Sequence, residues 1–164
     1  MNRPALFLDR DGVLNADHGY VFRAADFEVL DGVFEALRLA AAHGYALIVI
    51  TNQSGIGRGY FTAADYAALE VHMRRLFAEE GVVLTDIYHC PHRPEAECDC
   101  RKPRPGMILL AAQEHGIDLG RSLMVGDKPS DAEAGRAAGV GMVELVTAER
   151  DLRDIVAALL VQQA

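Results

Sequence analysis

Short apolar runs alternate with amphipathic segments along the chain. The apolar runs occupy residues 5–8, 46–50, 87–89, 123–125 and 142–146. Runs of this length suit buried strands, and the segments between them place their apolar residues at helical spacing. Strands that alternate with helices pair in parallel and are joined by right-handed crossovers. The pattern therefore predicts an α/β fold with a doubly wound, Rossmann-like and mostly parallel sheet of about five strands, covered by helices on both faces.

Capping residues and glycines mark where the predicted helices begin and end. Thr62 and Asp65 have the spacing of a capping box, and either Ser130 or Asp131 is placed to cap a later helix. From these signals we expect helices over residues 31–44, 62–81 and 130–139, a helix that begins at residue 105 or 106, and a C-terminal helix. The C-terminal helix carries one apolar stripe for the core, formed by Leu152, Ile155, Val156, Leu159 and Leu160.

Length and composition indicate one hydrophobic core. The chain has 164 residues, of which 51% are hydrophobic, and we expect residues 1–164 to form a single domain. No apolar run approaches the ~20 residues of a membrane span, and residues 1–4 lead into the first strand without the apolar stretch of a signal peptide. We therefore expect a cytoplasmic protein that does not bind membranes, and we expect it to be a monomer.

The charge pattern disfavours nucleic acid as a partner. The formal net charge is −8, and the 16 lysines and arginines are dispersed along the chain. Binding to a phosphate backbone requires clustered basic residues, which this sequence lacks.

Two acids follow the first predicted strand. If the strand geometry continues, alternation points Asp9 and Asp11 to the same side, with Arg10 turned away. Two carboxylates held that close are unfavourable unless a cation neutralises them or one keeps its proton. A Mg²⁺ ion would leave an Asp9 oxygen free to attack an electrophile, while a protonated Asp11 could serve a leaving group as general acid. The alternative is a loop of solvated aspartates.

Polar residues also follow the other predicted strands. In such sheets ligands bind beyond the carboxyl ends of the strands. Thr51 could hold a phosphate oxygen, and the glycine-rich turn at 55–59 could cradle an oxyanion with its N–H groups. Lys102 is a candidate phosphoryl clamp, and Asp127 is the preferred second metal ligand. Asp131 suits either the same site or a helix N-cap.

A cluster of cysteines suggests a second metal. The only three cysteines of the chain and one histidine share a short loop, as Cys90, His92, Cys98 and Cys100. Three thiolates and an imidazole make a complete tetrahedral set for a structural zinc ion, in a reducing compartment. The alternative is three incidental cysteines beside a surface histidine. Zinc would rigidify a loop that is poor in apolar residues and would fix Arg101 and Lys102 directly after it.

The order of these motifs resembles the haloacid dehalogenase-like phosphohydrolase superfamily. The motifs are Asp-x-Asp-Gly at residue 9, a strand-end threonine, a lysine, and Gly-Asp-x-x-x-Asp at residue 126. The resemblance implies that Asp9 attacks phosphorus to give an aspartyl-phosphate, and that Asp11 is the general acid and base. It further implies Mg²⁺ bound by Asp9, the backbone carbonyl of Asp11 and Asp127. Thr51 and Lys102 would hold the phosphoryl oxygens, with Asp131 as possible support.

The loops resemble one family more closely, the heptose-1,7-bisphosphate 7-phosphatases, and less closely the histidinol-phosphatases. Members of this family lack a separate cap domain and act on a small phosphosugar. The resemblance implies that the substrate contacts Asp17, His18, Gly19, Tyr20, Asn52, Gln53, Ser54, Arg101 and Lys128. After the last strand, where the family usually carries an extra loop and strand, residues 147–149 pass directly into the final helix. One wall of the pocket is therefore expected to be missing or rebuilt.

The resemblance implies removal of the C7 phosphate of D-glycero-D-manno-heptose 1,7-bisphosphate. Three alternatives remain open. Histidinol phosphate is the nearest rival substrate. A polynucleotide 3′-phosphatase would share the chemistry but should carry a basic groove. A non-catalytic binding protein of the same fold would lack turnover.

Overall fold

One parallel sheet forms the centre of the computed structural model, which describes residues 2–162. Its strands are β1 (Ala5–Leu8), β2 (Ala46–Asn52), β3 (Asp86–Cys90), β4 (Leu123–Gly126) and β5 (Met142–Leu145). They lie in the order β3-β2-β1-β4-β5, and all four pairings are parallel. The predicted parallel sheet is confirmed. The chain winds to one side of β1 and then to the other, so a ligand crevice is expected at the carboxyl end of β1.

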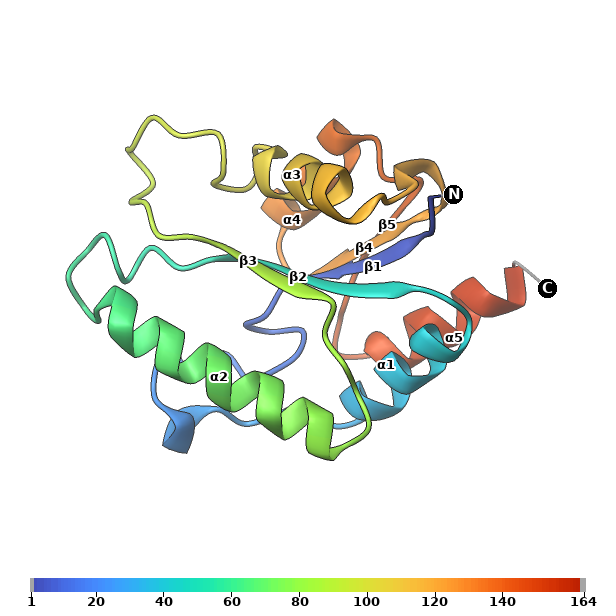
Figure 1. The fold of residues 1–164 in the computed structure, drawn as a ribbon, viewed down its shortest axis with the longest axis horizontal. Coiled ribbons are helices and arrows are strands. Elements are labelled where there is room, and N and C mark those ends of the chain that lie inside the picture. The colour runs from blue at the N-terminus through green and yellow to red at the C-terminus, as the bar shows by residue number, and fades with distance from the viewer. Residues whose placement is uncertain (1, 163–164) are drawn as a thin grey trace.

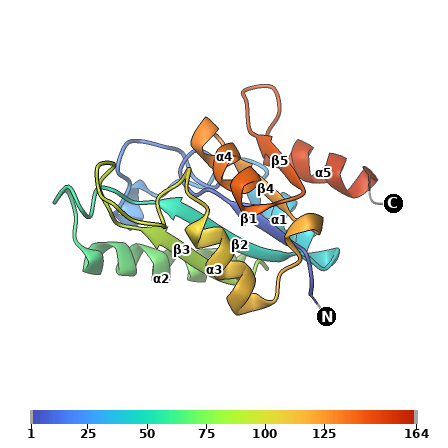
Figure 2. The same ribbon diagram turned by 90° about the horizontal axis from the view of Figure 1, so that it is seen from above.

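Helices cover both faces of the sheet, as predicted. The helices are α1 (Val33–Ala42), α2 (Ala63–Glu79), α3 (Gly106–His115), α4 (Pro129–Ala138) and α5 (Leu152–Gln162). Helices α1, α2 and α5 lie on one face, and α3 and α4 lie on the other (Figure 1). The view from above shows α3 and α4 side by side over the strands (Figure 2).

The three central strands, β1, β2 and β4, are buried almost throughout, which explains why they read as continuous apolar runs, whereas the edge strands β3 and β5 are only partly buried. Along β1, Leu6 and Leu8 enter the core cluster beneath α1, α2 and α5, whereas Ala5 and Phe7 enter the cluster beneath α3 and α4. The sheet therefore anchors the residues that follow each strand on a rigid base.

The helix boundaries agree with the capping signals except at α4. The Thr62 and Asp65 capping box of α2 is confirmed, with reciprocal hydrogen bonds of 3.0 and 2.9 Å. The N-cap residue of α4 is Lys128 rather than Ser130 or Asp131, because the helix begins earlier, at Pro129. The Asp131 side chain still caps the helix start from within it, since it accepts from the N–H groups of Asp127 and Lys128 at 3.1 Å. Proline suits the first helical position because its φ angle is already helical and its missing N–H is not needed there. Asp131 then lies in the first turn of the helix.

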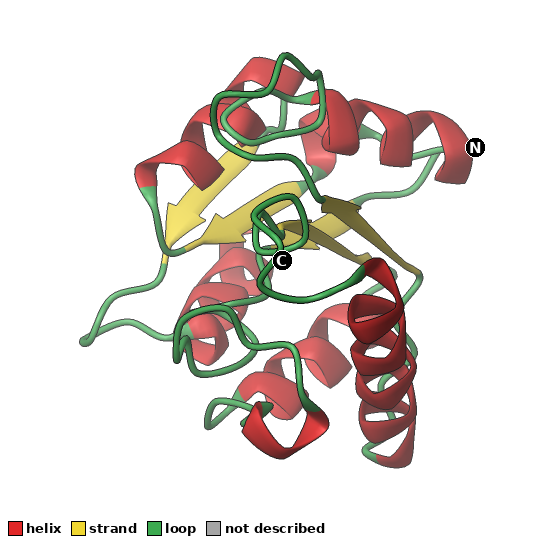
Figure 3. Ribbon diagram, turned by 90° about the vertical axis from the view of Figure 1, so that its left-hand side faces the viewer, coloured by secondary structure: helices red, strands yellow, loops and turns green. Residues whose placement is uncertain are grey.

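The loops at the carboxyl edge are short, and residues 2–162 contain no inserted cap domain. The loops that follow β2 and β3 extend from the same edge and meet where Gly57 N donates a 2.9 Å hydrogen bond to the Pro91 carbonyl (Figures 1 and 3). After β5, a single bridge between Thr147 and Arg150 closes a turn that leads into α5. Within the described residues, no helix is both long enough and apolar enough to cross a bilayer.

Candidate active site

Three carboxylates meet at the carboxyl ends of β1 and β4. Ligand oxygens of Asp9, Asp127 and Asp131 all lie within 4.8 Å of one another. Asp9 is only 7% exposed, and its backbone N–H donates to the Val125 carbonyl, which fixes it between the two strands. The pKa of Asp9 is raised to about 7, first by burial and then by Asp131 and Asp127, against the opposing effect of Lys102. Crowded, buried carboxylates of this kind favour a bound cation.

The acid cluster fits a magnesium ion. The Oδ1 atom of Asp127 is buried and has no hydrogen-bond partner in the protein. Burial also raises the pKa of Asp127. A buried carboxylate oxygen without a donor needs a ligand, and Mg²⁺ prefers carboxylate and carbonyl oxygens together with water.

Gly12 allows Asp127 to approach the loop after β1. Its φ angle is +86°, and a Cβ atom there would lie 2.2 Å from Asp127 Oδ2. The left-handed conformation costs an L-residue about 1–2 kcal/mol, and the contact would displace the carboxylate.

We expect Gly12→Ala to raise the Mg²⁺ concentration for half-maximal activity at least ~10-fold, because carboxylate placement decides metal affinity. Titration of activity with Mg²⁺, alongside thermal unfolding, measures this. Gly44→Ala is the matched control, because Gly44 has a φ angle of +87° and no atom within 4 Å of the added Cβ. It should lose stability but keep its Mg²⁺ requirement. An unchanged requirement in Gly12→Ala would contradict the expected displacement of Asp127.

Lys102 is buried against the acids at 3% exposure. Its Nζ atom lies 2.9 Å from Asp9 Oδ1, 2.6 Å from Asp131 Oδ1 and 2.8 Å from the Ile50 carbonyl. Burial alone would lower the pKa of Lys102, but Asp9 and Asp131 raise it. A charged ammonium group is thus held beside Asp9, where it can also meet a phosphoryl oxygen.

Asn52 holds the backbone of Lys102. Its side-chain oxygen accepts from Lys102 N at 3.0 Å, and its side-chain nitrogen donates to the Lys102 carbonyl at 3.2 Å. This residue was predicted to contact substrate, and the structure gives it a positioning role as well. The lysine is therefore tied to the end of β2.

The Asp11 carboxylate has a different environment from that of Asp9. It accepts hydrogen bonds from Arg10 at 2.9 Å, Asn15 at 3.0 Å and Gln53 at 3.1 Å. Arg10 is 2% exposed and also donates to the Val21 carbonyl. The expectation that Arg10 turns away was wrong, because β1 ends at residue 8 and strand alternation does not extend to residues 9–11. Asp131, rather than Asp11, completes the carboxylate cluster with Asp9.

A polar pocket of about 320 Å³ opens beside Asp11. It is lined by Asp11, Asp17, Gly19, Tyr20, Asn52, Gln53, Ser54, Arg101, Lys128 and Ser130. Eight of the nine predicted substrate residues therefore lie around one space. Thr51 is fully buried and outside the lining, and its hydroxyl oxygen accepts from the side chain of Gln53, which lines the pocket, at 2.9 Å. All the lining residues precede residue 131, so the shortened segment after β5 supplies no wall.

His18 and Ser130 differ from their predicted places. The His18 ring is exposed and lies 3.3 Å from Glu28, outside the lining of the pocket. Ser130 was considered only as a helix cap, yet it lines the pocket at the start of α4. Arg10 and Asn15, which bond the Asp11 carboxylate, were also missed. Their closeness in sequence to Asp11, a predicted catalytic residue, was the one signal that the sequence offered for them.

The four predicted zinc ligands come together in the zinc loop (residues 90–100). The Cys90 sulfur lies 3.3 Å from His92 Nδ1 and 3.9 Å from the Cys98 sulfur, and the Cys100 sulfur lies 3.2 Å from His92 Nδ1. Tetrahedral zinc, with Zn–S of about 2.3 Å, holds its sulfur ligands about 3.8 Å apart. The sulfur atoms of Cys90 and Cys100 are 2.6 Å apart, so a bound zinc ion would move these two sulfurs further from each other. The donor set fits zinc and leaves no position for water.

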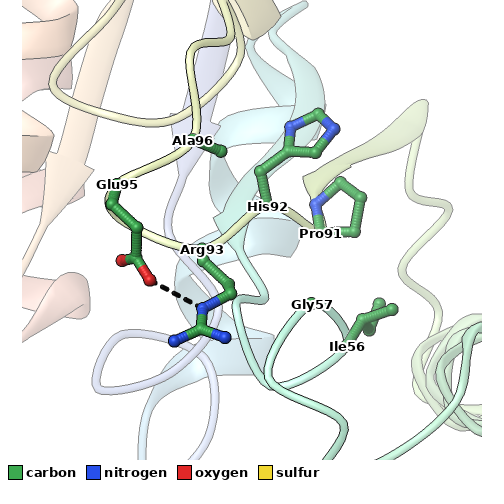
Figure 4. A pocket seen from close by; sticks show the side chains of 7 residues that line it. All are labelled: Ile56, Gly57, Pro91, His92, Arg93, Glu95 and Ala96. Atoms are coloured by element: carbon green, nitrogen blue, oxygen red, sulfur yellow. Dashed lines mark ion pairs between the residues drawn. The ribbon is translucent and has the colours of Figure 1, made fainter.

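A second hollow, of about 420 Å³, lies between the turn after β2 and the zinc loop. Its walls are Ile56 and Gly57 on one side and residues 91–93, 95 and 96 on the other, with Arg93 and Glu95 paired at 2.7 Å (Figure 4). These walls are mainly apolar and contain none of the clustered acids. The polar pocket beside Asp11 is therefore the candidate substrate site.

Comparison with known proteins assigns the chain to a family. The haloacid dehalogenase-like hydrolase family matches residues 2–139. A D-glycero-alpha-D-manno-heptose-1,7-bisphosphate 7-phosphatase of Burkholderia mallei is 50% identical over 153 residues, covering 89% of this chain and 81% of the relative. A D-glycero-beta-D-manno-heptose-1,7-bisphosphate 7-phosphatase of Helicobacter pylori is 53% identical over 137 residues, covering 83% of this chain and 79% of the relative.

A solved structure agrees with these relatives. The fold is similar to that of D,D-heptose 1,7-bisphosphate phosphatase from B. bronchiseptica in complex with magnesium and phosphate, with a TM-score of 0.87 and 30% identity. The alignment covers 98% of this chain and 99% of that chain. The matched residues include all four strand-end motifs, and the chain therefore belongs to the haloacid dehalogenase-like hydrolase family.

Proposed function

We propose that this protein is a magnesium-dependent phosphatase that removes the C7 phosphate of D-glycero-D-manno-heptose 1,7-bisphosphate. The observation that carries the proposal is the pocket beside Asp11, because two cationic side chains, Arg101 and Lys128, line it together with Asp11. Arg101 has a buried guanidinium nitrogen without a hydrogen-bond partner, and Lys128, whose Nζ atom lies 4.0 Å from Asp17, lines the same pocket. A second phosphate would satisfy both. The names of the relatives at about 50% identity support the same substrate.

In the first step an Asp9 oxygen attacks the phosphorus of the C7 phosphate. The bond from phosphorus to the C7 oxygen breaks, and the carboxyl group of Asp11 gives its proton to that oxygen. In the second step Asp11 takes a proton from water, whose oxygen attacks the aspartyl-phosphate. The bond from phosphorus to Asp9 breaks, which releases inorganic phosphate and restores both residues.

The remaining residues hold the transferring group. Lys102 and Thr51 would bind its oxygens, while Asp131 orients Lys102 from the opposite side. Asp9, Asp127 and the backbone carbonyl of Asp11 would bind magnesium, whose charge offsets that of the phosphoryl oxygens.

We also propose that residues 1–164 act as one domain, as a monomer in the cytoplasm, with neither nucleic acid nor membrane as a partner. The net charge of −8 supports the absence of nucleic-acid binding. A reducing compartment keeps the thiolates of the zinc loop available to the metal.

The cationic side chains in the pocket favour a bisphosphate over histidinol phosphate. The end of histidinol phosphate remote from its phosphate carries a positively charged amine, which these side chains would repel. Phosphate release should be measured for both anomers of heptose 1,7-bisphosphate, heptose 7-phosphate, fructose 1,6-bisphosphate, histidinol phosphate and a 3′-phosphorylated oligonucleotide. Heptose 1,7-bisphosphate should give the highest kcat/KM, with phosphorus NMR showing loss from C7. A higher kcat/KM for histidinol phosphate would overturn the assignment.

Arg101→Ala should reduce the preference for bisphosphate over monophosphate. A charge-assisted contact contributes about 1.5–3 kcal/mol, so kcat/KM for the bisphosphate should fall roughly ten- to a hundredfold. Turnover of p-nitrophenyl phosphate should change less, because the reacting groups remain. Arg121→Ala is the control, since Arg121 is exposed and lies in the turn before β4. A preference unaffected by loss of Arg101 would exclude it from the second phosphate site.

A further inference from the structure

Two aromatic pairs connect the loop after β1 to the loop after β2. The Tyr20 and Tyr60 rings meet edge to face at 4.7 Å, and the Phe22 and Phe61 rings stack at 5.0 Å. We call these four residues the aromatic clasp. Residues 20 and 22 belong to the loop that supplies one pocket wall, and residues 60 and 61 follow the turn that supplies another. The clasp therefore fixes the two walls relative to each other.

The inner pair of the clasp is structural. Phe61 is buried and packs against Gly55, where a Cβ atom would lie 2.2 Å from the ring. The Tyr60 N–H donates to the Gly55 carbonyl at 2.8 Å and closes the turn. The backbone at residue 60 is thus set by buried contacts, independently of the Tyr60 side chain.

The outer pair is exposed and adjoins the substrate. Tyr20 and Tyr60 are 47% and 57% exposed, although large aromatic rings gain stability from burial. Tyr20 lines the pocket, whereas Tyr60 does not and touches Tyr20 instead. Tyr20 is also the one non-glycine residue with a positive φ angle in the described part of the chain, at 52°. Bulky residues adopt this conformation rarely, and such strain often marks ligand sites.

We propose that Tyr60 is a positioning residue for substrate selectivity. The backbone of Tyr20 is left-handed, and the contact with Tyr60 holds the Tyr20 ring in place. The ring then forms a wall of the pocket against which the C–H face of a sugar phosphate packs. The inference rests on the proposed function and adds a residue to it. Because neither tyrosine belongs to the acid cluster of Asp9, Asp127 and Asp131, loss of this wall should affect binding of the sugar and not the transfer of the phosphoryl group.

The test compares Tyr60→Ala with Tyr60→Phe. The alanine variant should raise KM for heptose 1,7-bisphosphate about three- to tenfold, in keeping with the loss of one aromatic pair, while kcat changes less than about twofold. Tyr60→Phe keeps the ring and should retain the wild-type KM. Val83→Ala is the control, because Val83 is exposed in the segment between α2 and β3. A KM increase in Tyr60→Phe equal to that of Tyr60→Ala would overturn the inference.

A double-mutant cycle separates action through Tyr20 from direct action. If Tyr60 acts through Tyr20, the variant that lacks both side chains should have the KM of Tyr20→Ala alone. Effects that multiply would overturn the inference. If Tyr60→Ala does not fold, Tyr60→Leu keeps apolar bulk without the ring and is evaluated by the same criteria.

Turnover of p-nitrophenyl phosphate distinguishes the two proposals. It should be the same in wild type and Tyr60→Ala, because this ester lacks the sugar. A wild-type protein with equal kcat/KM for sugar phosphates and p-nitrophenyl phosphate would overturn the proposed function and the inference together. If the wild-type protein prefers sugar phosphates but the KM for heptose 1,7-bisphosphate is unchanged in Tyr60→Ala, the inference alone would be overturned.

Discussion

Asp9→Asn is expected to lower kcat at least about 10³-fold, as loss of a covalent nucleophile does in other hydrolases. An amide does not attack phosphorus at a useful rate, and it is a weaker ligand for magnesium than a carboxylate. The fold should persist, because asparagine has the same shape as aspartate. It also removes one negative charge from a buried site that holds two further acids. Turnover with saturating Mg²⁺ and the unfolding temperature measure the two effects separately.

Asp11→Asn is the matched variant for this experiment. It should also be severely impaired, since it loses the proposed general acid and base, but it keeps Asp9, the proposed nucleophile. Mass spectrometry after a rapid quench should therefore detect a phosphorylated enzyme with Asp11→Asn and none with Asp9→Asn. Wild-type turnover in Asp9→Asn would remove Asp9 from the role of nucleophile.

Removal of zinc is expected to have the second largest effect. Protein purified without added zinc should contain one zinc ion per chain, and Cys98→Ser or a strong chelator should release it. Structural zinc contributes about 10–16 kcal/mol to the folding of small zinc peptides, so the zinc loop should lose its order when the ion leaves. Activity should fall at least about tenfold, because Arg101 and Lys102 follow the last ligand directly. Magnesium should not restore it.

Elemental analysis, hydrogen exchange of residues 90–103 and activity with saturating Mg²⁺ test these expectations. Glu97→Gln is the control, because Glu97 is an exposed acid of the same loop that belongs to neither predicted metal site. It should keep both zinc and activity. A metal-free preparation with full activity would show that the loop does not depend on zinc.

The sheet could be predicted from sequence because its signal is local. The three central strands, β1, β2 and β4, are buried almost throughout, so their apolar runs are visible without knowledge of their neighbours. All five predicted strands are present. The family could be predicted for a similar reason, since its motifs lie where the strands end. The start of α4 was placed too late because Pro129 was not read as a helix-starting residue.

The parts that were missed depend on contacts distant in sequence. Asn52 is separated from Lys102 by 50 residues, and no local pattern indicates their paired hydrogen bonds. Arg10 follows a strand, but its orientation depends on the chain leaving that strand at residue 9 and on the Val21 carbonyl. The contact of Tyr60 with Tyr20 likewise exists only once two loops have folded against each other. Local patterns locate the reacting groups, whereas tertiary structure decides what holds them.

The reversal of strand order at β1 has an evolutionary consequence. It gathers Asp9, Asp127 and Asp131 at the centre of the sheet, while the residues that line the pocket come from the segments after β1, β2, β3 and β4. The loop after β1 supplies Val13, Leu14, Val21 and Phe27 to the core, but none of the residues that line the pocket belongs to either hydrophobic core cluster. Mutations that change the preferred substrate can therefore accumulate without unfolding the protein, and the same chemistry can be redirected to new phosphate esters one loop at a time.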